Sequence, residues 1–220
     1  MTIGLILLLI AGILVLLGVG QRVLDKLRLT DRQALFWMAM IAAGGFLPDI
    51  RVTDQFRFNI GGALIPLALS VYLWIRADTA RERARSLAAA VGVGAAVYAL
   101  GRFMPSEPEN IQIDPALMNG LAAGVIGYLF GRSRRGAYIA ATVGVLGASV
   151  ANAIFVWSQG VAQPLTLGGA GAFDVTVISG FLAVLLSELI GEIVERIARG
   201  RRRPMREFKN GEFIEREESR

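Results

Sequence analysis

The charged residues of this sequence come in short bursts, and seven long apolar runs separate the bursts. The runs span residues 2–20, 33–47, 59–75, 87–101, 115–131, 137–157 and 175–193. A helix of about 20 apolar residues crosses the roughly 30 Å hydrocarbon layer of a bilayer and satisfies its own backbone hydrogen bonds. The second and fourth runs are short for this role, which flanking arginines that reach the headgroups compensate. The pattern predicts an all-α membrane protein with about seven transmembrane helices.

The first run has a competing interpretation as a signal peptide. Signal peptides carry positive charge before the apolar segment, whereas here Arg22, Lys26, Arg28 and Arg32 follow it. We therefore expect residues 2–20 to form a retained helix.

The basic residues alternate between the two sides of the predicted membrane. If the N-terminus is outside, the cytoplasmic segments hold 20 of the 23 Lys and Arg residues, and the outer segments hold three. Short cytoplasmic loops are enriched in Lys and Arg, so this split predicts an external N-terminus and a cytoplasmic C-terminus. We expect a multi-pass protein of the cytoplasmic membrane, with a membrane domain at 1–198 and a cytoplasmic tail at 199–220.

The tail is first basic and then acidic. A juxtamembrane cluster at 199–203 contains four arginines, for which we expect anionic lipid headgroups as the partner. Nucleic acid is not expected, because no aromatic residues are interleaved with these arginines. Asn210 and Gly211 stand between two alternating segments, which predicts a β-hairpin.

The sequence contains no Cys and no His. Disulfides, thiol nucleophiles and the usual zinc sites are therefore excluded, together with the side chain most used for proton transfer near neutral pH. We expect no metal, no cofactor and no catalytic residues. Any enzymatic activity would have to depend on carboxylates, hydroxyls or lysines.

Two of the predicted outer loops resemble each other. Residues 56–63 read FRFNIGGA, and residues 164–170 read PLTLGGA. Their backbone polar groups need partners, so we predict that 56–59 and 164–167 lie close together and pair as short strands. Repetition in the same sense is also typical of parallel repeats in transporters. The alternative is chance recurrence of Gly-Gly-Ala in a chain with 26 glycines.

The same segments carry a resemblance to a known family. Residues 59–66 (NIGGALIP) and 168–174 (GGAGAFD) resemble the two signature segments of a bacterial and archaeal membrane family, domain of unknown function 1614. The similarity covers about residues 5–195 and departs at the Leu-Pro-Asp of 47–49. It implies a multi-pass membrane protein and no particular activity. The motif residues that we expect to shape the structure are Gly61, Gly62, Pro66, Gly168, Gly169, Gly171 and Phe173.

Polar residues inside membrane helices are costly and are the first candidates for function. The candidates for an ion or solute pathway are Asp174, Glu188, Asn152, Asn59 and Asn119. Asp174 stands just before a predicted helix, so it either caps that helix or provides a cation- or proton-binding carboxylate. For Asn152 and Asn119 the alternative is a hydrogen bond that joins neighbouring helices.

Glu188 is the most informative of these candidates. Only thirteen residues separate it from Asp174, which is about 20 Å of helix, so one of the two carboxylates lies at membrane depth. Its neighbour four residues on, Glu192, is also acidic. We expect Glu188 to point into the bundle, toward Asn152 or a backbone carbonyl freed at a kink by Pro66. The alternative is a glutamate that reaches the inner interface.

Three functions remain open at this point. The first is a small-solute or ion transporter or channel, and the second is a membrane scaffold or assembly factor without transport. The third is an intramembrane aspartyl protease that would use Asp114 and Asp174, which requires the two carboxylates to share one water. A homo-oligomer is possible in each case.

Overall fold

The computed structural model describes residues 29–103, 115–131, 133–171, 174–201, 206–209 and 212–215. The chain divides into two compact units, Met1–Ser187 and Glu188–Arg220. The predicted helix at 2–20 lies outside the described residues, as do Asp114 and Phe173.

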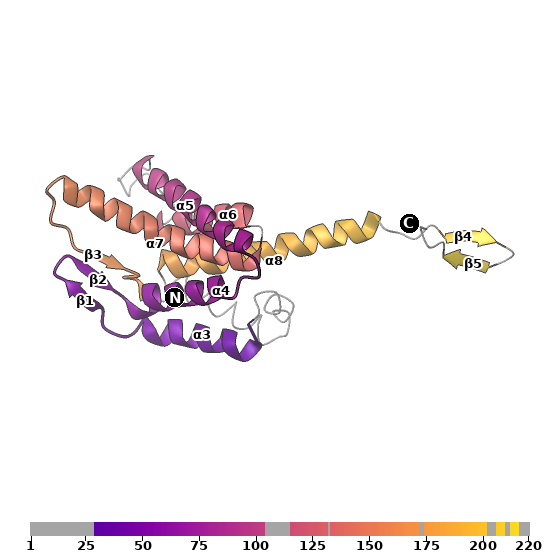
Figure 1. Ribbon diagram of the computed structural model, residues 1–220, viewed down its shortest axis with the longest axis horizontal. Coiled ribbons are helices and arrows are strands. Elements are labelled where there is room, and N and C mark those ends of the chain that lie inside the picture. The colour runs from indigo at the N-terminus through magenta and orange to yellow at the C-terminus, as the bar shows by residue number, and fades with distance from the viewer. Residues whose placement is uncertain are drawn as a thin grey trace. The chain divides into compact units, whose positions relative to one another are not determined.

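Six α-helices occupy the second to seventh predicted runs (Figure 1). They are α3 (Asp31–Gly44), α4 (Ile65–Ile75), α5 (Ala80–Phe103), α6 (Pro115–Gly131), α7 (Arg134–Ser158) and α8 (Val175–Arg201). A π-helix, η1 (Ile60–Leu64), leads directly into α4. The prediction of these helices from apolar runs is confirmed, although α5 and α8 extend further into the charged segments than the runs do.

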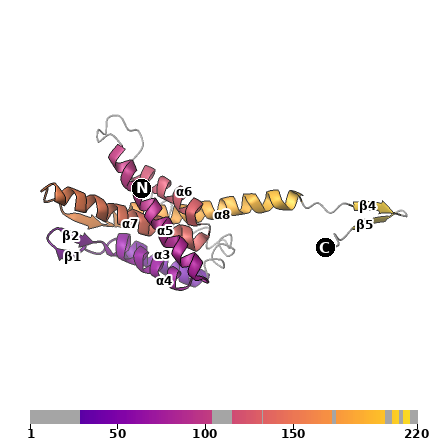
Figure 2. The ribbon, with the colours of Figure 1, turned by 45° about the horizontal axis from the view of Figure 1, so that its top comes forward.

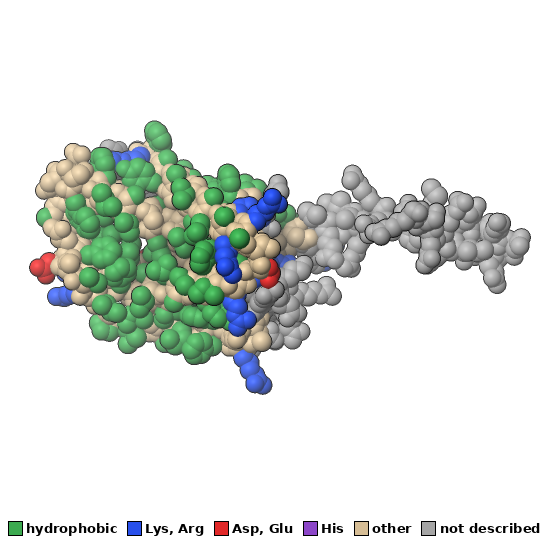
Figure 3. All heavy atoms as spheres, in the orientation of Figure 1, with side chains coloured by type: hydrophobic (Ala, Val, Ile, Leu, Met, Phe, Trp, Pro, Cys, Tyr) green, Lys and Arg blue, Asp and Glu red, His purple; other side chains and the backbone are tan. Residues whose placement is uncertain are grey.

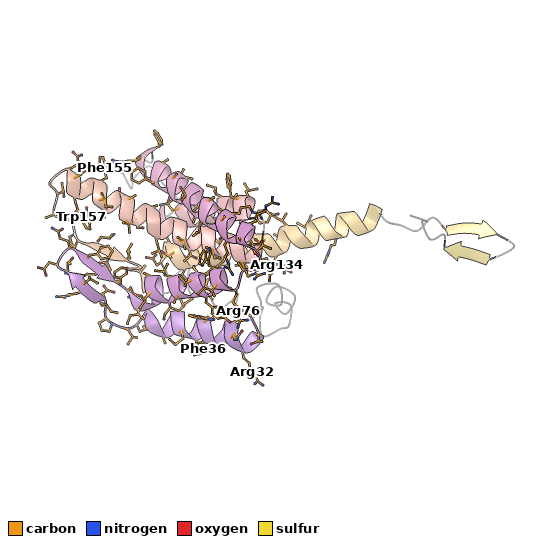
Figure 4. The ribbon with its side chains drawn as sticks, in the orientation of Figure 1. Arg32, Phe36, Arg76, Arg134, Phe155 and Trp157 are labelled. Atoms are coloured by element: carbon orange, nitrogen blue, oxygen red, sulfur yellow. The ribbon has the colours of Figure 1, made fainter. Side chains whose placement is uncertain are left out.

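The helices of the first unit form layers around α7. In Figures 1 and 2, α7 lies between the α3–α4 pair and the α5–α6 pair, and α7 contacts α4, α5 and α6. Figure 4 shows Arg32, Arg76 and Arg134 at one end of the helices and Phe155 and Trp157 at the other. Successive helices therefore run in opposite directions.

Small residues set the spacing between these helices. Gly144 of α7 lies against Val93 of α5, and a Cβ there would come within 2.6 Å of that side chain. Gly124 of α6 faces Leu182 of α8 in the same way, at 3.0 Å. Glycines at these positions allow the helices to pack closely, as is common in membrane helix bundles.

Large apolar side chains lie on the outside of the first unit. Phe36, Val71, Val91, Leu129 and Ile154 are all exposed, and Figure 3 shows patches of hydrophobic side chains spread across the visible face of this unit. The fully buried side chains include the small hydroxyl residues Ser70, Ser86, Thr142, Thr176 and Ser179. The interior also contains many apolar side chains, such as Ile41, Leu73 and Val93, so this unit is apolar inside and outside. In a water-soluble protein, exposed apolar patches are small.

Among the described helices, α5 and α7 are long and apolar enough to cross a membrane. Only 28% of the most apolar stretch of α5 is buried, which is too little for the core helix of a soluble domain. Together with the exposed apolar surface, this indicates a membrane protein.

A small sheet lies at the end of the bundle that holds Phe155 and Trp157 (Figures 1 and 4). Its strands are β1 (Ile50–Thr53), β2 (Phe56–Phe58) and β3 (Leu165–Leu167), in the order β1-β2-β3. β2 and β3 are parallel, with Phe56 opposite Leu165 and Phe58 opposite Leu167. The predicted pairing of the two loops is therefore confirmed, whereas β1 was not predicted.

In the second unit, β4 (Arg206–Lys209) and β5 (Glu212–Glu215) pair as antiparallel strands. Arg206 is opposite Glu215, and Lys209 is opposite Glu212. The hairpin predicted from Asn210 and Gly211 is confirmed by this register.

Candidate functional site: a glycine junction beside Asn59

Asn59 is the centre of the most densely bonded part of the sheet end. Its side chain is buried, its Oδ1 accepts a hydrogen bond from the Gly62 amide at 2.9 Å, and its Nδ2 donates to Asp49 Oδ1 at 2.9 Å. Its backbone amide donates to the Leu167 carbonyl at 2.9 Å. Asn59 thus ties together the loop before β1, the β2–β3 pair and the start of η1.

The π-helix η1 replaces the regular start of α4. The Leu64 amide donates to the Asn59 carbonyl and the Ile65 amide to the Ile60 carbonyl, five residues back in each case. Pro66 is the second residue of α4 and has no amide to continue an α-helical ladder. The irregularity that we expected from Pro66 is therefore a π segment before the proline. Such segments are often found at functional sites.

Three glycine segments meet backbone to backbone beside Asn59, and we call this contact the glycine junction. It consists of 44–45 at the end of α3, 61–62 in η1 and 168–171 after β3. A Cβ at Gly62 would overlap the carbonyl oxygen of Gly168, and a Cβ at Gly61 would overlap the Gly45 amide. Gly171 has φ +61°, and a Cβ there would lie 2.9 Å from the Gly45 oxygen. Only glycine fits these positions.

The repeat that the sequence suggested is only partial. The strands β2 and β3 correspond in direction and in pairing. The Gly-Gly-Ala segments differ, because Gly61 and Gly62 lie inside η1 whereas Gly168 and Gly169 precede α8 by several residues. Gly169 belongs to the segment 168–171 but is exposed, and a Cβ there would not meet either of the other two segments.

Asp174 caps α8, as one of its two interpretations predicted. Its Oδ1 accepts a hydrogen bond from the Thr176 amide at 2.9 Å, and its Oδ2 makes a longer contact of 3.5 Å with the Ala170 amide. Its own amide donates to the Gly171 carbonyl at 3.0 Å, which links the cap to the glycine junction. A carboxylate at a helix N-terminus is stabilised by these amides and by the helix dipole.

A family described as "Protein of unknown function (DUF1614)" matches residues 21–186. The chain belongs to this family. The match confirms the resemblance carried by residues 59–66 and 168–174, and it includes the whole glycine junction. No curated protein and no solved structure is similar enough to be matched.

The other candidates of the DUF1614 chain do not join the junction. Asn152 is exposed on α7, and no described residue hydrogen-bonds its side-chain amide, so the helix-to-helix bond expected for it is absent from the described part of the chain. Asn119 of α6 is half-buried, and its Oδ1 is buried without a hydrogen bond among the described residues. Glu188 is half-buried and belongs to the second unit.

Sequence reasoning missed a second polar cluster, at the opposite end of the helices. Arg135 is buried at the start of α7, where its Nη1 donates to the Arg76 carbonyl at 2.6 Å and its Nη2 to Asp78 at 2.7 Å. Its Nε lies 3.9 Å from Glu82, which also accepts from the Ser133 hydroxyl at 3.0 Å. We call these groups the Arg135 cluster. The sequence carried one signal for this cluster: the basic segment 76–86, which faces Arg135, also contains two acidic residues.

Asp49 was also missed as a site residue. Asp49 belongs to the Leu-Pro-Asp of 47–49, where the chain departs from the family pattern. This departure was the signal, because an acidic side chain at that position needs a hydrogen-bond partner. Asn59 is that partner.

Proposed function

We propose that the chain is a multi-pass protein of the cytoplasmic membrane with seven spans, an external N-terminus and a cytoplasmic C-terminus. The 20-to-3 division of basic residues supports this orientation. The alternating helix directions support it too, because Arg32, Arg76 and Arg134 gather at one end (Figure 4). Along α7, Arg134 and Trp157 are roughly 35 Å apart, which suits a bilayer with its headgroup boundaries.

We further propose that it transports a small solute or ion. The observation that carries this proposal is the discontinuous element β2–η1–α4, which begins at the glycine junction against the segment that leads into α8. Transporters commonly place their sites where such interrupted helices meet, because these expose helix ends and backbone polar groups at depth. The tight contact at the junction corresponds to a closed gate on the outer side.

Asp174 and Glu188 are the carboxylates of the proposed pathway, together with Asn59 and Asn119. Asn152 is not assigned to it, because its side chain is exposed on α7. Asp174 is engaged in capping α8, so we assign the proton- or cation-dependent step to Glu188. The helix length supports this choice, because α8 begins at Val175 and Glu188 lies about 20 Å along it.

A scaffold without transport is the second candidate, and one observation favours it. The buried hydroxyls of Ser70, Ser179 and Ser187 donate to carbonyls of their own helices at 2.9, 3.1 and 2.8 Å. Hydroxyls satisfied in this way offer little to a solute. The aspartyl protease is less well supported, because Asp174 is committed to the α8 cap.

The deciding experiment is a flux assay with the full chain in proteoliposomes. An internal pH dye and Na⁺- and K⁺-sensitive dyes follow the collapse of imposed gradients of each cation. We expect the wild type to collapse at least one gradient and Glu188→Gln to abolish this while folding normally. Glu192→Gln, one helical turn further on, is the matched control and should retain flux. If the folded wild type leaves all three gradients intact, the scaffold is the better interpretation.

A further inference from the structure

The C-terminal end of α4 carries more positive charge than its acidic neighbours neutralise. Arg83 Nη2 donates to the carbonyl oxygens of Ile75 and Ala77, at 3.1 and 3.2 Å. These carbonyls are at the negative end of the α4 dipole, so Arg83 is used to satisfy the helix terminus.

The two acids of segment 76–86 are used by a different cation. Asp78 and Glu82 both face Arg135, which is buried and needs a counter-charge. These acids are therefore engaged with a cation inside the protein and do not neutralise the arginines on its surface.

Arg76 and Arg81 are the arginines left at the surface. Both are exposed, and neither has an acidic partner in the part of the chain that the structure describes. The Arg76 guanidinium lies over the Tyr72 ring, 5.3 Å from its centroid. A cation–π contact of this kind holds the guanidinium near the ring, and a guanidinium has several N–H donors that can bind phosphate in a bidentate way.

Apolar surface continues from these arginines along α4. Val71 and Ile75 are exposed on the faces next to Tyr72 and Arg76. Cationic and apolar groups thus follow one another from the helix end toward its middle, which matches the order of headgroup and acyl chains in a phospholipid.

We propose that Arg76 and Arg81 bind the phosphate of an anionic phospholipid in the cytoplasmic leaflet, with its acyl chains against Val71 and Ile75. The inference rests on the membrane orientation proposed above and is separate from the basic tail at 199–203. Two unneutralised cations match an anionic headgroup better than a zwitterionic one, which brings its own positive charge.

Tryptophan quenching in vesicles tests this site, because the tryptophans report separately on the two ends. The ring centroids of Trp37 and Tyr72 are 6.1 Å apart, and the Arg83 guanidinium lies over the Trp74 ring. Trp157 is at the opposite end of the bundle (Figure 4). The full chain with Trp157→Phe reports on the proposed site. The chain with Trp37→Phe and Trp74→Phe reports on the outer end. Each is reconstituted in phosphatidylcholine with a small fraction of brominated phosphatidylglycerol or brominated phosphatidylcholine.

We expect brominated phosphatidylglycerol to quench the inner tryptophans more strongly than brominated phosphatidylcholine. The difference should correspond to a local enrichment of phosphatidylglycerol of about fivefold for each arginine, the effect of one basic charge near anionic lipid. The outer reporter should be quenched equally by both lipids. Arg76→Gln with Arg81→Gln should remove the preference, and Arg76→Lys with Arg81→Lys should keep part of it. Arg102→Gln is the matched control, because Arg102 is also exposed and stacked on an aromatic ring, that of Phe155.

Three results would overturn the lipid site. Equal quenching of the inner reporter by both lipids removes it, and so does a preference that survives Arg76→Gln with Arg81→Gln. Loss of the preference on addition of millimolar inorganic phosphate at constant ionic strength would identify a soluble anion as the ligand instead. If neither brominated lipid quenches either reporter, the proposed membrane orientation fails as well.

Discussion

The two ends of the helix bundle are held together by different means. At the sheet end, the glycine junction brings three backbone segments into contact with no side chain between them. At the other end, the long side chain of Arg135 reaches from α7 to the Arg76 carbonyl and the Asp78 carboxylate after α4, and to the Glu82 carboxylate in the first turn of α5. The glycine junction forms because no side chains separate the backbone segments, so an added Cβ disrupts it. The Arg135 cluster depends on one side chain, so a chemically similar side chain can replace it in part.

The largest effect should follow from Gly62→Ala. The added methyl group would overlap the Gly168 carbonyl oxygen, and neither backbone segment can move without breaking the β2–β3 pair. We expect a loss of about 3 kcal/mol or more in stability, at the upper end of the range for overpacked cores. The measurement is the fraction of monodisperse protein that remains after heating in a mild detergent.

Gly169→Ala is the matched control for the glycine junction. It lies in the same segment, but its Cβ would meet only Thr166, with the side chain at 3.3 Å and the carbonyl oxygen at 3.5 Å. Its stability should stay within about 0.5 kcal/mol of the wild type, as for ordinary surface substitutions. Equal losses for the two variants would show that the junction is not the sensitive feature.

Arg135→Gln should have a smaller but clear effect. It removes the counter-charge of Asp78 and Glu82 and one partner of the Arg76 carbonyl. The Asp78 side chain is 41% exposed, so water takes over part of the lost interaction. We expect a loss of about 2 kcal/mol, below the cost of breaking a fully buried pair.

Arg135→Lys distinguishes charge from geometry in this cluster. A lysine keeps the charge but lacks the planar fork that serves three acceptors at once. Thermal unfolding of the two variants in the same detergent should therefore place Arg135→Lys between the wild type and Arg135→Gln. A Lys variant as unstable as the Gln variant would show that charge contributes little here.

The difference between the two ends also explains what could be predicted from the sequence. Apolar runs revealed six helices, because bilayer thickness fixes how long such runs must be. The alternating segments 56–58 and 165–167 revealed strands β2 and β3, and the need to satisfy their backbone groups revealed the pairing. Apolar runs and alternating segments are local patterns, and few structures can satisfy them.

The remaining features depend on how the helices rotate and pack. The third segment of the glycine junction, Gly44 and Gly45, has no pattern that distinguishes it from other glycines. The partners of Arg135 come from a distant segment, 76–82, and the charge count that predicted both segments on one side of the membrane could not show that they touch. The sequence also could not show that Asn152 faces outward, because the rotation of α7 is set by the contacts of its neighbours.

The smallest loss of stability should follow from substitution of Asp174. These variants test both of its roles, as the cap of α8 and as a carboxylate of the proposed pathway. Asp174→Ala removes the oxygen that accepts from the Thr176 amide, so we expect a loss of about 1 kcal/mol, the usual contribution of a helix cap. Asp174→Asn keeps a capping oxygen and removes the charge, so its thermal stability should stay close to that of the wild type. In the proteoliposome assay, a stable Asp174→Asn variant without flux would show that the charge acts in the pathway, in addition to capping α8. A stable variant with normal flux would confine Asp174 to the cap and leave Glu188 as the carboxylate of the proposed pathway.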